Sequence, residues 1–590
     1  MARLAVVLHE GSLAEQQVRL GRILDFFGVP WKSAGASSLA DPEFDAQEHV
    51  IFGTAQTIAA ALRRAGQTNR GPSPPAAFYV YLDDNLSASE QGLREICGGE
   101  GLALKKAPGG ELPIRVSSKL AEFTGAMSGV EVRTRLRAED AILAPGVADG
   151  ESRYGTVISA GSAPVFIRFE RNGVPVFFCA SSHMLDVDQP ISAGFFDVKD
   201  HFCSVVPLVT FIRHMFQEVA WGPQELGACL IIDDPLLALR YGHCDFRKLR
   251  DQMRRYAFTT NIAFIPWNWR RTSRTGSDFF SRESQHFSVS IHGCDHTVRE
   301  FGTTSLELLH NRAKLAQARM QNHQARTGIR HDAVMVFPQG VFSSVSPEAL
   351  KLNGYLAAVN TEILPVDSDG KRTRIRDVWD IAIMSYSGFP IFTRRYPRHG
   401  LENFAFDLLL GKPCLIVSHH DLFKDDAPVI DFIVKLQALN SRLSWRPLGD
   451  VVRRACRRRS NGAGAQAVEM YGSELILENP SDKVIEVSVR KREEQPQAVA
   501  ELWWDQEPAK WAAEAGQLVF AGDIPPHSES RLRVRYLEHP AAGSTGRSLR
   551  FELAVATRRM LSEFRDNYLS RGGLLSPAVV NLVNAITKSH

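Results

Sequence analysis

The chain is poor in cysteine, and none of its eight cysteines forms a C-x-x-C pair. This pattern argues against a disulfide framework and against a cysteine zinc site, and indicates free thiols in a reducing compartment. No stretch approaches the roughly 18 uncharged apolar residues that a membrane helix needs. The formal net charge is only +3 over 590 residues, so we expect no overall attraction to nucleic acid.

The N-terminus also lacks the apolar core of a secretory signal. Its apolar run is short and ends at His9 and Glu10. We therefore expect a cytoplasmic protein without a transmembrane segment. With 44% hydrophobic and 23% charged residues, the composition is that of an ordinary globular protein, and the length predicts several domains.

Residues 1–222 alternate strand-like and helix-like segments and predict an open α/β domain of flavodoxin or amidotransferase type. No phosphate-binding glycine loop is present, so the function of this domain stays open. It could recognise a carrier nucleotide, or it could dock the barrel. Asn172-Gly173 predicts a tight hairpin turn. Cys179 with His183 nearby lacks flanking glycines, and we interpret Cys179 as structural. The predicted strands are Leu4–Leu8, His49–Gly53, Phe78–Leu82, Val165–Phe169 and Val176–Cys179.

Residues 223–458 follow a strand-then-helix rhythm, with helices expected over Ser305–Ala325 and Pro428–Leu439. Seven such repeats predict a distorted (β/α)7 barrel. The expected strands are Ala228–Asp233, Asn261–Pro266, Phe287–His292, Val334–Phe337, Tyr355–Asn360, Ile381–Ser385 and Pro413–Ser418.

The remainder of the chain predicts a small domain and a helical tail. Small residues over 460–465 indicate a linker, preceded by the basic run Arg453–Arg459, which we interpret as a solvated helix end. Short alternating runs within 467–540 predict an antiparallel β-sandwich. Residues 541–590 are expected to form helices over Phe551–Tyr568 and from Ser576 onward. The chain is thus expected to be an α/β multidomain protein.

Ionisable residues follow three of the predicted barrel strands. They are Asp233-Asp234, His292 with His296 four residues on, and His419-His420-Asp421. The carboxyl ends of barrel strands share one rim, so these side chains should meet there. Two histidines four residues apart and one carboxylate can hold a divalent metal and leave positions open for water and substrate. One aspartate of the pair could bind the metal while its neighbour takes a proton from the water. His419 or His420 could protonate the leaving group.

Over roughly residues 228–450, these motifs resemble the polysaccharide deacetylase family, carbohydrate esterase family 4. Its members are distorted barrels that use a divalent metal to remove acetyl groups from sugars. The resemblance implies that Asp233 is the general base, that Asp234, His292 and His296 are the metal ligands, and that His420 is the general acid. It also implies that Val336–Gly340 lines the pocket and that a backbone N–H there holds the oxyanion.

Three departures from the family pattern stand out. Pro235 replaces the usual glycine after the aspartates, and Val336–Gly340, which corresponds to the third motif of the family, lacks the usual arginine and aromatic. Arg394 or Arg395 could replace that arginine. For the aspartate that tunes the catalytic histidine, Asp377 and Asp380 are the candidates.

Further pocket residues are expected close to the strand ends, and we assign substrate contacts to Pro338, Gln339, Gly340, Trp267, Trp269, Tyr241 and His419.

The leading hypothesis is a metal-dependent deacetylase, a hydrolase of sugar amides or esters. Its expected substrate is an acetylated sugar or oligosaccharide, nucleotide- or lipid-linked, in the synthesis of bacterial surface polysaccharide. Zinc suits the ligands best, while cobalt, nickel, manganese and iron stay open. One alternative is an inactive glycan-binding or assembly module. Another is a glycoside hydrolase that uses Asp233 with Asp295 or Asp421, which would leave the histidine pair unexplained.

Overall fold

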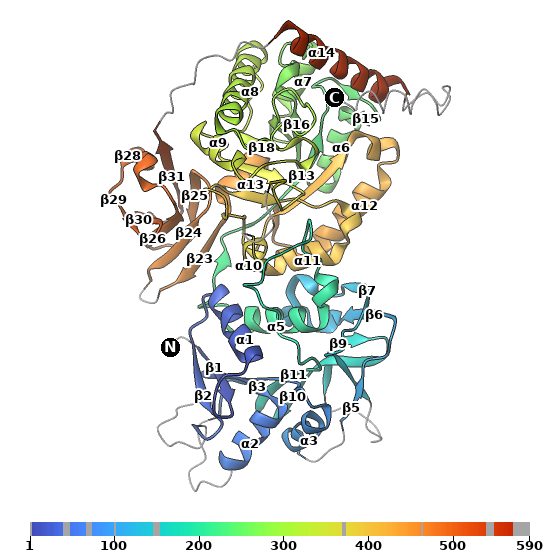
Figure 1. The fold of residues 1–590 in the computed structure, drawn as a ribbon, viewed down its shortest axis with the longest axis vertical. Coiled ribbons are helices and arrows are strands. Elements are labelled where there is room, and N and C mark those ends of the chain that lie inside the picture. The colour runs from blue at the N-terminus through green and yellow to red at the C-terminus, as the bar shows by residue number, and fades with distance from the viewer. Residues whose placement is uncertain are drawn as a thin grey trace. The chain divides into compact units, whose positions relative to one another are not determined.

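The computed structural model forms two compact units (Figure 1). Unit 1 comprises residues 1–189, 196–222 and 400–410, and unit 2 comprises 190–195, 223–399 and 411–590. The described residues are 3–38, 48–65, 74–98, 102–144, 154–367, 373–461, 464–537 and 548–569. Within them, none of the helices combines the length and apolar character that crossing a bilayer requires.

Unit 1 is an open α/β domain, as predicted. Its nine-stranded sheet has the order β2-β1-β3-β4-β11-β10-β9-β6-β7. The half from β2 to β11 is parallel, and β10, β9, β6 and β7 continue it antiparallel. The strands are β1 (Leu4–His9), β2 (Trp31–Gly35), β3 (His49–Thr54), β4 (Ala77–Tyr81), β6 (Glu111–Val116), β7 (Glu131–Arg135), β9 (Gly155–Ala160), β10 (Ala163–Arg171) and β11 (Val174–Cys179).

Helices pack on both faces of this sheet. On one face, Phe52 and Tyr79 contact Phe211 of α5, while the opposite face forms a core with α2 and α3. Asn172 and Gly173 both have positive φ, as the tight β10–β11 turn requires. The longer helices are α1 (Glu15–Phe26), α2 (Ala55–Ala65), α3 (Leu86–Ile96), α5 (Phe202–Met215) and α11 (Leu401–Leu410).

The predicted barrel forms the main part of unit 2. Its parallel strands have the order β20-β19-β18-β17-β16-β13-β21. A parallel bridge between Arg395 and Ile416 brings the two ends of the sheet together, so seven strands nearly close a barrel. The strands are β13 (Leu226–Asp233), β16 (Thr260–Phe264), β17 (Phe287–His292), β18 (Val334–Val336), β19 (Ala357–Asn360), β20 (Ile391–Thr393) and β21 (Cys414–His419).

One strand prediction is wrong. Ile381–Ser385 is not a barrel strand, and the strand that pairs with β19 is β20. The earlier run makes only the isolated bridge Ile383–Ile391 and is buried beside the barrel. Two apolar runs lie close together in sequence here, and only the later one satisfies the backbone groups of β19.

Helices surround the barrel. In α8 (Leu306–Thr327), the Ser305 hydroxyl accepts the N–H of Leu308, and Gly328 ends the helix in the left-handed conformation. The others are α6 (Phe246–Tyr256), α7 (Arg274–Arg282), α9 (Ser346–Leu352), α10 (Ile375–Trp379), α12 (Ala427–Leu439) and α13 (Leu448–Arg454).

The β-sandwich begins earlier than predicted. β23 (Cys456–Ser460) pairs antiparallel with β24 (Gln466–Met470), so the predicted linker falls between two paired strands of one sheet, and its first residue, Ser460, lies in β23. The sandwich is not purely antiparallel, because β24 runs parallel to β26. One sheet also contains β26 (Ile485–Arg492), β30 (Gln517–Ile524) and β29 (Trp511–Glu514), and the other contains β25 (Glu474–Asn479), β31 (Ser528–Tyr536), β27 (Val499–Trp504) and β28 (Glu507–Pro508).

The tail forms α14 (Leu549–Phe564), which continues as a π-helical turn over Arg565–Leu569. The helix expected from Ser576 lies outside the described residues.

Candidate metal centre

The ends of β13 and β17 bring together the residues expected to bind metal. Asp233 ends β13, and Asp234 follows it with φ of 81°. This left-handed turn lets both carboxylates reach the rim, although adjacent residues on a strand point to opposite faces. His292 ends β17, and His296 lies in the next loop with φ of 59°.

Asp234, His292 and His296 form a compact group of potential ligands. Asp234 Oδ1 lies 3.4 Å from His292 Nε2 and 3.1 Å from His296 Nε2, and the three ligand atoms lie within 4.8 Å of one another. His292 Nδ1 lies 2.9 Å from the Val336 carbonyl oxygen. Donation of the Nδ1 proton to that oxygen leaves the Nε2 lone pair facing Asp234. This set fits a divalent metal with open coordination positions.

Electrostatics also suit a cation. Burial would raise the pKa of Asp234, but His296 and His292 hold it well below its ordinary value, so the carboxylate is ionised. The pKa of His296 is lowered, chiefly by burial, which favours the neutral, ligating imidazole. The pKa of His292 is raised because Asp233 and Asp234 outweigh its burial.

The loop between the two histidines is held by Glu300. Its buried carboxylate accepts backbone N–H bonds from Cys294 at 2.9 Å, Asp295 at 2.8 Å and His296 at 3.1 Å. Gly293 has φ of 65°, and a Cβ there would collide with Pro338. The glycine therefore allows the metal loop and the third-motif loop to pack together.

Asp233 has a partner that supports its expected role as a base. Both Nη atoms of Arg394, just after β20, donate to its two carboxylate oxygens at 2.7 Å. The two side chains are 4% and 3% exposed. Burial alone would raise the pKa of Asp233, but Arg394, followed by His292, lowers it. Of the two arginines considered as replacements for the missing one, Arg394 contacts Asp233.

The two adjacent histidines diverge. His419 is in register with Asp233 on the neighbouring strand, and its Nε2 lies 3.1 Å from the Tyr396 hydroxyl. His420 is buried, and its Nε2 lies 3.5 Å from Asp566 of the C-terminal segment. The Tyr241 ring packs edge-on against His420, with ring centres 5.2 Å apart.

The remaining predicted residues lie at different places around the rim. Pro338–Gly340 follows β18, and Gln339 Oε1 accepts the Arg299 N–H. Trp267 donates its backbone N–H to Cys294 and so adjoins the metal loop. Trp269 is packed with Arg270 and Arg326, and none of its described contacts reaches the metal ligands.

The aspartate beside His420 is not one of the two candidates. Asp377 caps the start of α10, and Asp380 contacts Tyr471 and Arg457. Asp566 takes this place, and sequence reasoning missed it because no local motif distinguishes that residue.

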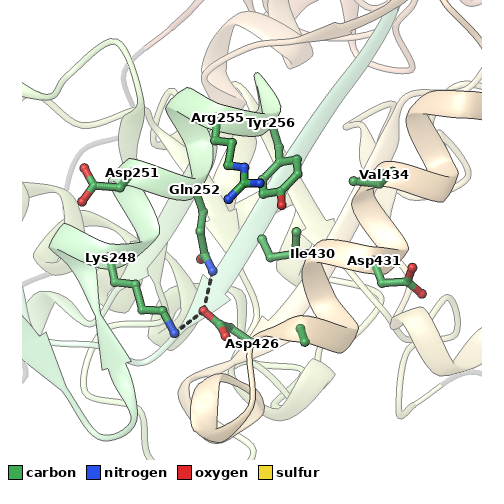
Figure 2. Close-up of a pocket in the computed structure, with 10 residues that line it drawn as sticks. Lys248, Asp251, Gln252, Arg255, Tyr256, Asp426, Ile430, Asp431 and Val434 are labelled. Carbon is green, nitrogen blue, oxygen red and sulfur yellow. Dashed lines mark hydrogen bonds and ion pairs between the residues drawn. The ribbon is translucent and has the colours of Figure 1, made fainter.

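Other features of the chain are separate from this site. Cys179 is buried, donates to the Cys203 carbonyl, and has its pKa raised to about 12 by burial, in keeping with a structural thiol. On the outside of the barrel, a groove of about 620 Å³ lies between α6 and α12. Figure 2 shows Lys248 and Gln252 reaching Asp426 across it. None of the predicted site residues lines this groove.

Comparison with protein-family models finds no match, and neither does comparison with curated protein sequences. Among solved structures, the chain is similar to Agd3, described as a novel carbohydrate deacetylase, with 9% identity, a TM-score of 0.48, and coverage of 90% of this chain and 98% of that one. It is also similar to a family 4 carbohydrate esterase from Streptomyces lividans in complex with acetate, with 14% identity, a TM-score of 0.21, and coverage of 36% of this chain and 86% of that one. A third similar structure is a family 4 acetyl xylan esterase from Clostridium thermocellum in complex with cobalt, with 12% identity, a TM-score of 0.23, and coverage of 38% of this chain and 89% of that one.

Proposed function

We propose that this chain is a metal-dependent deacetylase that hydrolyses an acetyl amide or ester on a saccharide. The observation that carries the proposal is the Asp234–His292–His296 group, of which His292 is buried, beside a second carboxylate, Asp233, which Arg394 holds ionised. A ligand triad and an adjacent base are the parts that hydrolysis of an acyl group by an activated water requires.

In this proposal, Asp234, His292 and His296 hold the cation through one oxygen and two nitrogens. Zinc is the best match, and a bound divalent metal polarises a carbonyl and lowers the pKa of water toward neutrality. Asp233 then accepts the proton of the attacking water. Arg394 keeps that carboxylate ionised and directed into the site.

The other half of the reaction is assigned to His420 and to the loop after β18. His420 donates a proton to the departing sugar nitrogen or oxygen. Gly340 and Val341 donate their amides within the turn, which leaves the Gln339 N–H as the candidate donor to the oxyanion. Gln339 has φ of 59°, a strained conformation that would turn this amide out of the strand direction.

Two alternatives from the sequence lose support. The inactive-module hypothesis rested on a missing arginine and a missing aromatic, and Arg394 makes an arginine contact to Asp233. A glycosidase would need Asp295 or Asp421 beside Asp233. However, Asp295 is buried in an ion pair with Arg319, and Asp421 is exposed.

The deciding experiment compares acetate release and metal content in four proteins: wild type, His292→Ala/His296→Ala, Asp233→Asn and the control His527→Ala, whose side chain is 63% exposed. The substrates are N- and O-acetylated sugars and oligosaccharides, free and nucleotide- or lipid-linked, because we place the reaction in bacterial surface polysaccharide synthesis. The double variant should lose metal and activity, and Asp233→Asn should keep metal but lose activity. Metal-loaded wild type that releases no acetate from any substrate would refute the proposal.

A further inference from the structure

The C-terminal helix α14 and the turn after it bury charged side chains, while several large apolar side chains of α14 are exposed. Its buried stripe is Val555, Arg559, Glu563 and Asp566, which are 3%, 3%, 7% and 4% exposed. These positions follow the i, i+4, i+8, i+11 spacing of one helix face. The large apolar residues on α14 that are exposed are Leu549, Leu553, Met560 and Phe564. A surface helix normally buries its apolar face, so polar contacts must hold this one in place.

Those polar contacts reach the loops around the proposed active site. Tyr241 O–H donates to Asp566 Oδ2 at 3.0 Å, and the Gly242 N–H donates to Asn567 Oδ1 at 2.9 Å. Arg271, in the loop after β16, forms an ion pair with Glu563. Figure 1 shows α14, in dark red, at the α7–α8 end of unit 2. The segment therefore contacts two neighbouring loops of the barrel rim.

The same segment meets His420. Asp566 Oδ2, which already accepts the Tyr241 hydroxyl, lies 3.5 Å from His420 Nε2. Arg565 Nε bonds the other carboxylate oxygen at 2.8 Å. On the opposite side of the imidazole, Gly242 has φ of 53°, and a Cβ there would collide with His420 Nδ1. The imidazole is thus confined between Gly242, the Tyr241 ring and the Asp566 carboxylate.

We infer that Asp566 is the positioning residue for His420, supplied by a segment that lies outside the barrel in sequence. The inference rests on the proposed function, in which His420 donates the proton to the leaving group. Asp566 accepts the Nε2–H and holds the ring in one orientation, which leaves Nδ1 to donate the proton to the leaving group, while Tyr241 and Arg565 hold the carboxylate. The active site is complete only when residues 549–569 are seated on the rim.

Acetate-release kinetics on the full chain would test this role. Asp566→Asn keeps the shape and removes the charge, Asp566→Glu restores the charge, and Asp482→Asn, at a side chain 94% exposed, is the matched control. We expect Asp566→Asn to lower kcat by about 10-fold or more with KM and metal content unchanged, since a general acid contributes about 10²–10⁴-fold. Asp566→Glu should recover part of that loss. Because the two residues act as one unit, His420→Ala/Asp566→Asn should be no slower than His420→Ala.

A second readout does not depend on activity. The imidazole nitrogen resonances of His420, assigned by their loss in His420→Ala, should shift in Asp566→Asn and not in Asp482→Asn. Unchanged kcat and resonances in Asp566→Asn, or fully additive losses in the double variant, would overturn the inference. If wild type releases no acetate but the His420 resonances shift, the contact stands and the proposed function fails.

Discussion

Replacing Arg394 with methionine should both destabilise the barrel and slow acetate release. The guanidinium makes two bonds of 2.7 Å to Asp233, and the two side chains are 3% and 4% exposed. Methionine keeps much of the packing volume but leaves the Asp233 carboxylate buried without its cation. Removing one partner of a buried pair typically costs about 3–5 kcal/mol, because an uncompensated charge remains.

A matched control exists on the same barrel. Arg254 makes two similar bonds, 2.9 and 3.0 Å, to Glu283, but its side chain is 51% exposed. Arg254→Met should therefore cost only about 0–1 kcal/mol, since Arg254 is half exposed and the buried Glu283 keeps Arg250 and His286 as partners. Denaturant unfolding of both variants measures the difference.

The double variant Arg394→Met/Asp233→Asn separates the charge effect from lost packing. Because asparagine removes the stranded charge, the double variant should be about 1–3 kcal/mol more stable than the sum of the single effects predicts. In acetate release, Arg394→Met should lower kcat while metal content is retained, as the three proposed ligands are intact. If Arg394→Met lowers the free energy of unfolding no more than Arg254→Met does, the reasoning is wrong. Additive effects of Arg394→Met and Asp233→Asn would likewise refute the claim that a buried, uncompensated charge causes the loss.

Three further substitutions test other parts of unit 2. Glu300→Gln should weaken metal affinity by about 10–100-fold, because the loop that presents His296 loses its carboxylate acceptor. A competitive chelator titration measures the affinity, and an unchanged value would show that Glu300 does not hold this loop for metal binding. Gly242→Ala should abolish acetate release with metal retained, since its Cβ would displace the His420 ring; normal kinetics would contradict that packing. Lys491 is 2% exposed and burial lowers its pKa from 10.5 to about 8, so between those pH values the unfolded chain binds more protons and wild-type stability rises with pH. Lys491→Met should therefore be more stable near pH 7, by at most about 3 kcal/mol at about 1.4 kcal/mol per pKa unit, and its advantage should shrink toward pH 10.5; equal pH slopes in thermal unfolding would count against this.

Local pattern was sufficient for the barrel and for its proposed ligands. Apolar runs of strand length, separated by helical segments, predict parallel strands whose carboxyl ends share a rim. The predicted bounds of β17 match the structure, and His292 follows from them. Local pattern was insufficient where two apolar runs competed, as at Ile381–Ser385 and β20, because the choice depends on which run β19 can pair with.

The sequence by itself determined which short-range groups can meet, namely the paired aspartates after a strand and two histidines four residues apart. Their geometry depends on backbone direction over a few residues, which periodicity encodes. Only the tertiary structure decided the partners of Asp233, Tyr241 and His420. Arg394 lies 161 residues from Asp233, and Asp566 lies 325 residues from Tyr241. Helical amphipathicity would have placed the apolar side of α14 inward, whereas long-range hydrogen bonds and ion pairs orient it the other way. Such contacts depend on how distant segments pack, and no local spacing specifies them.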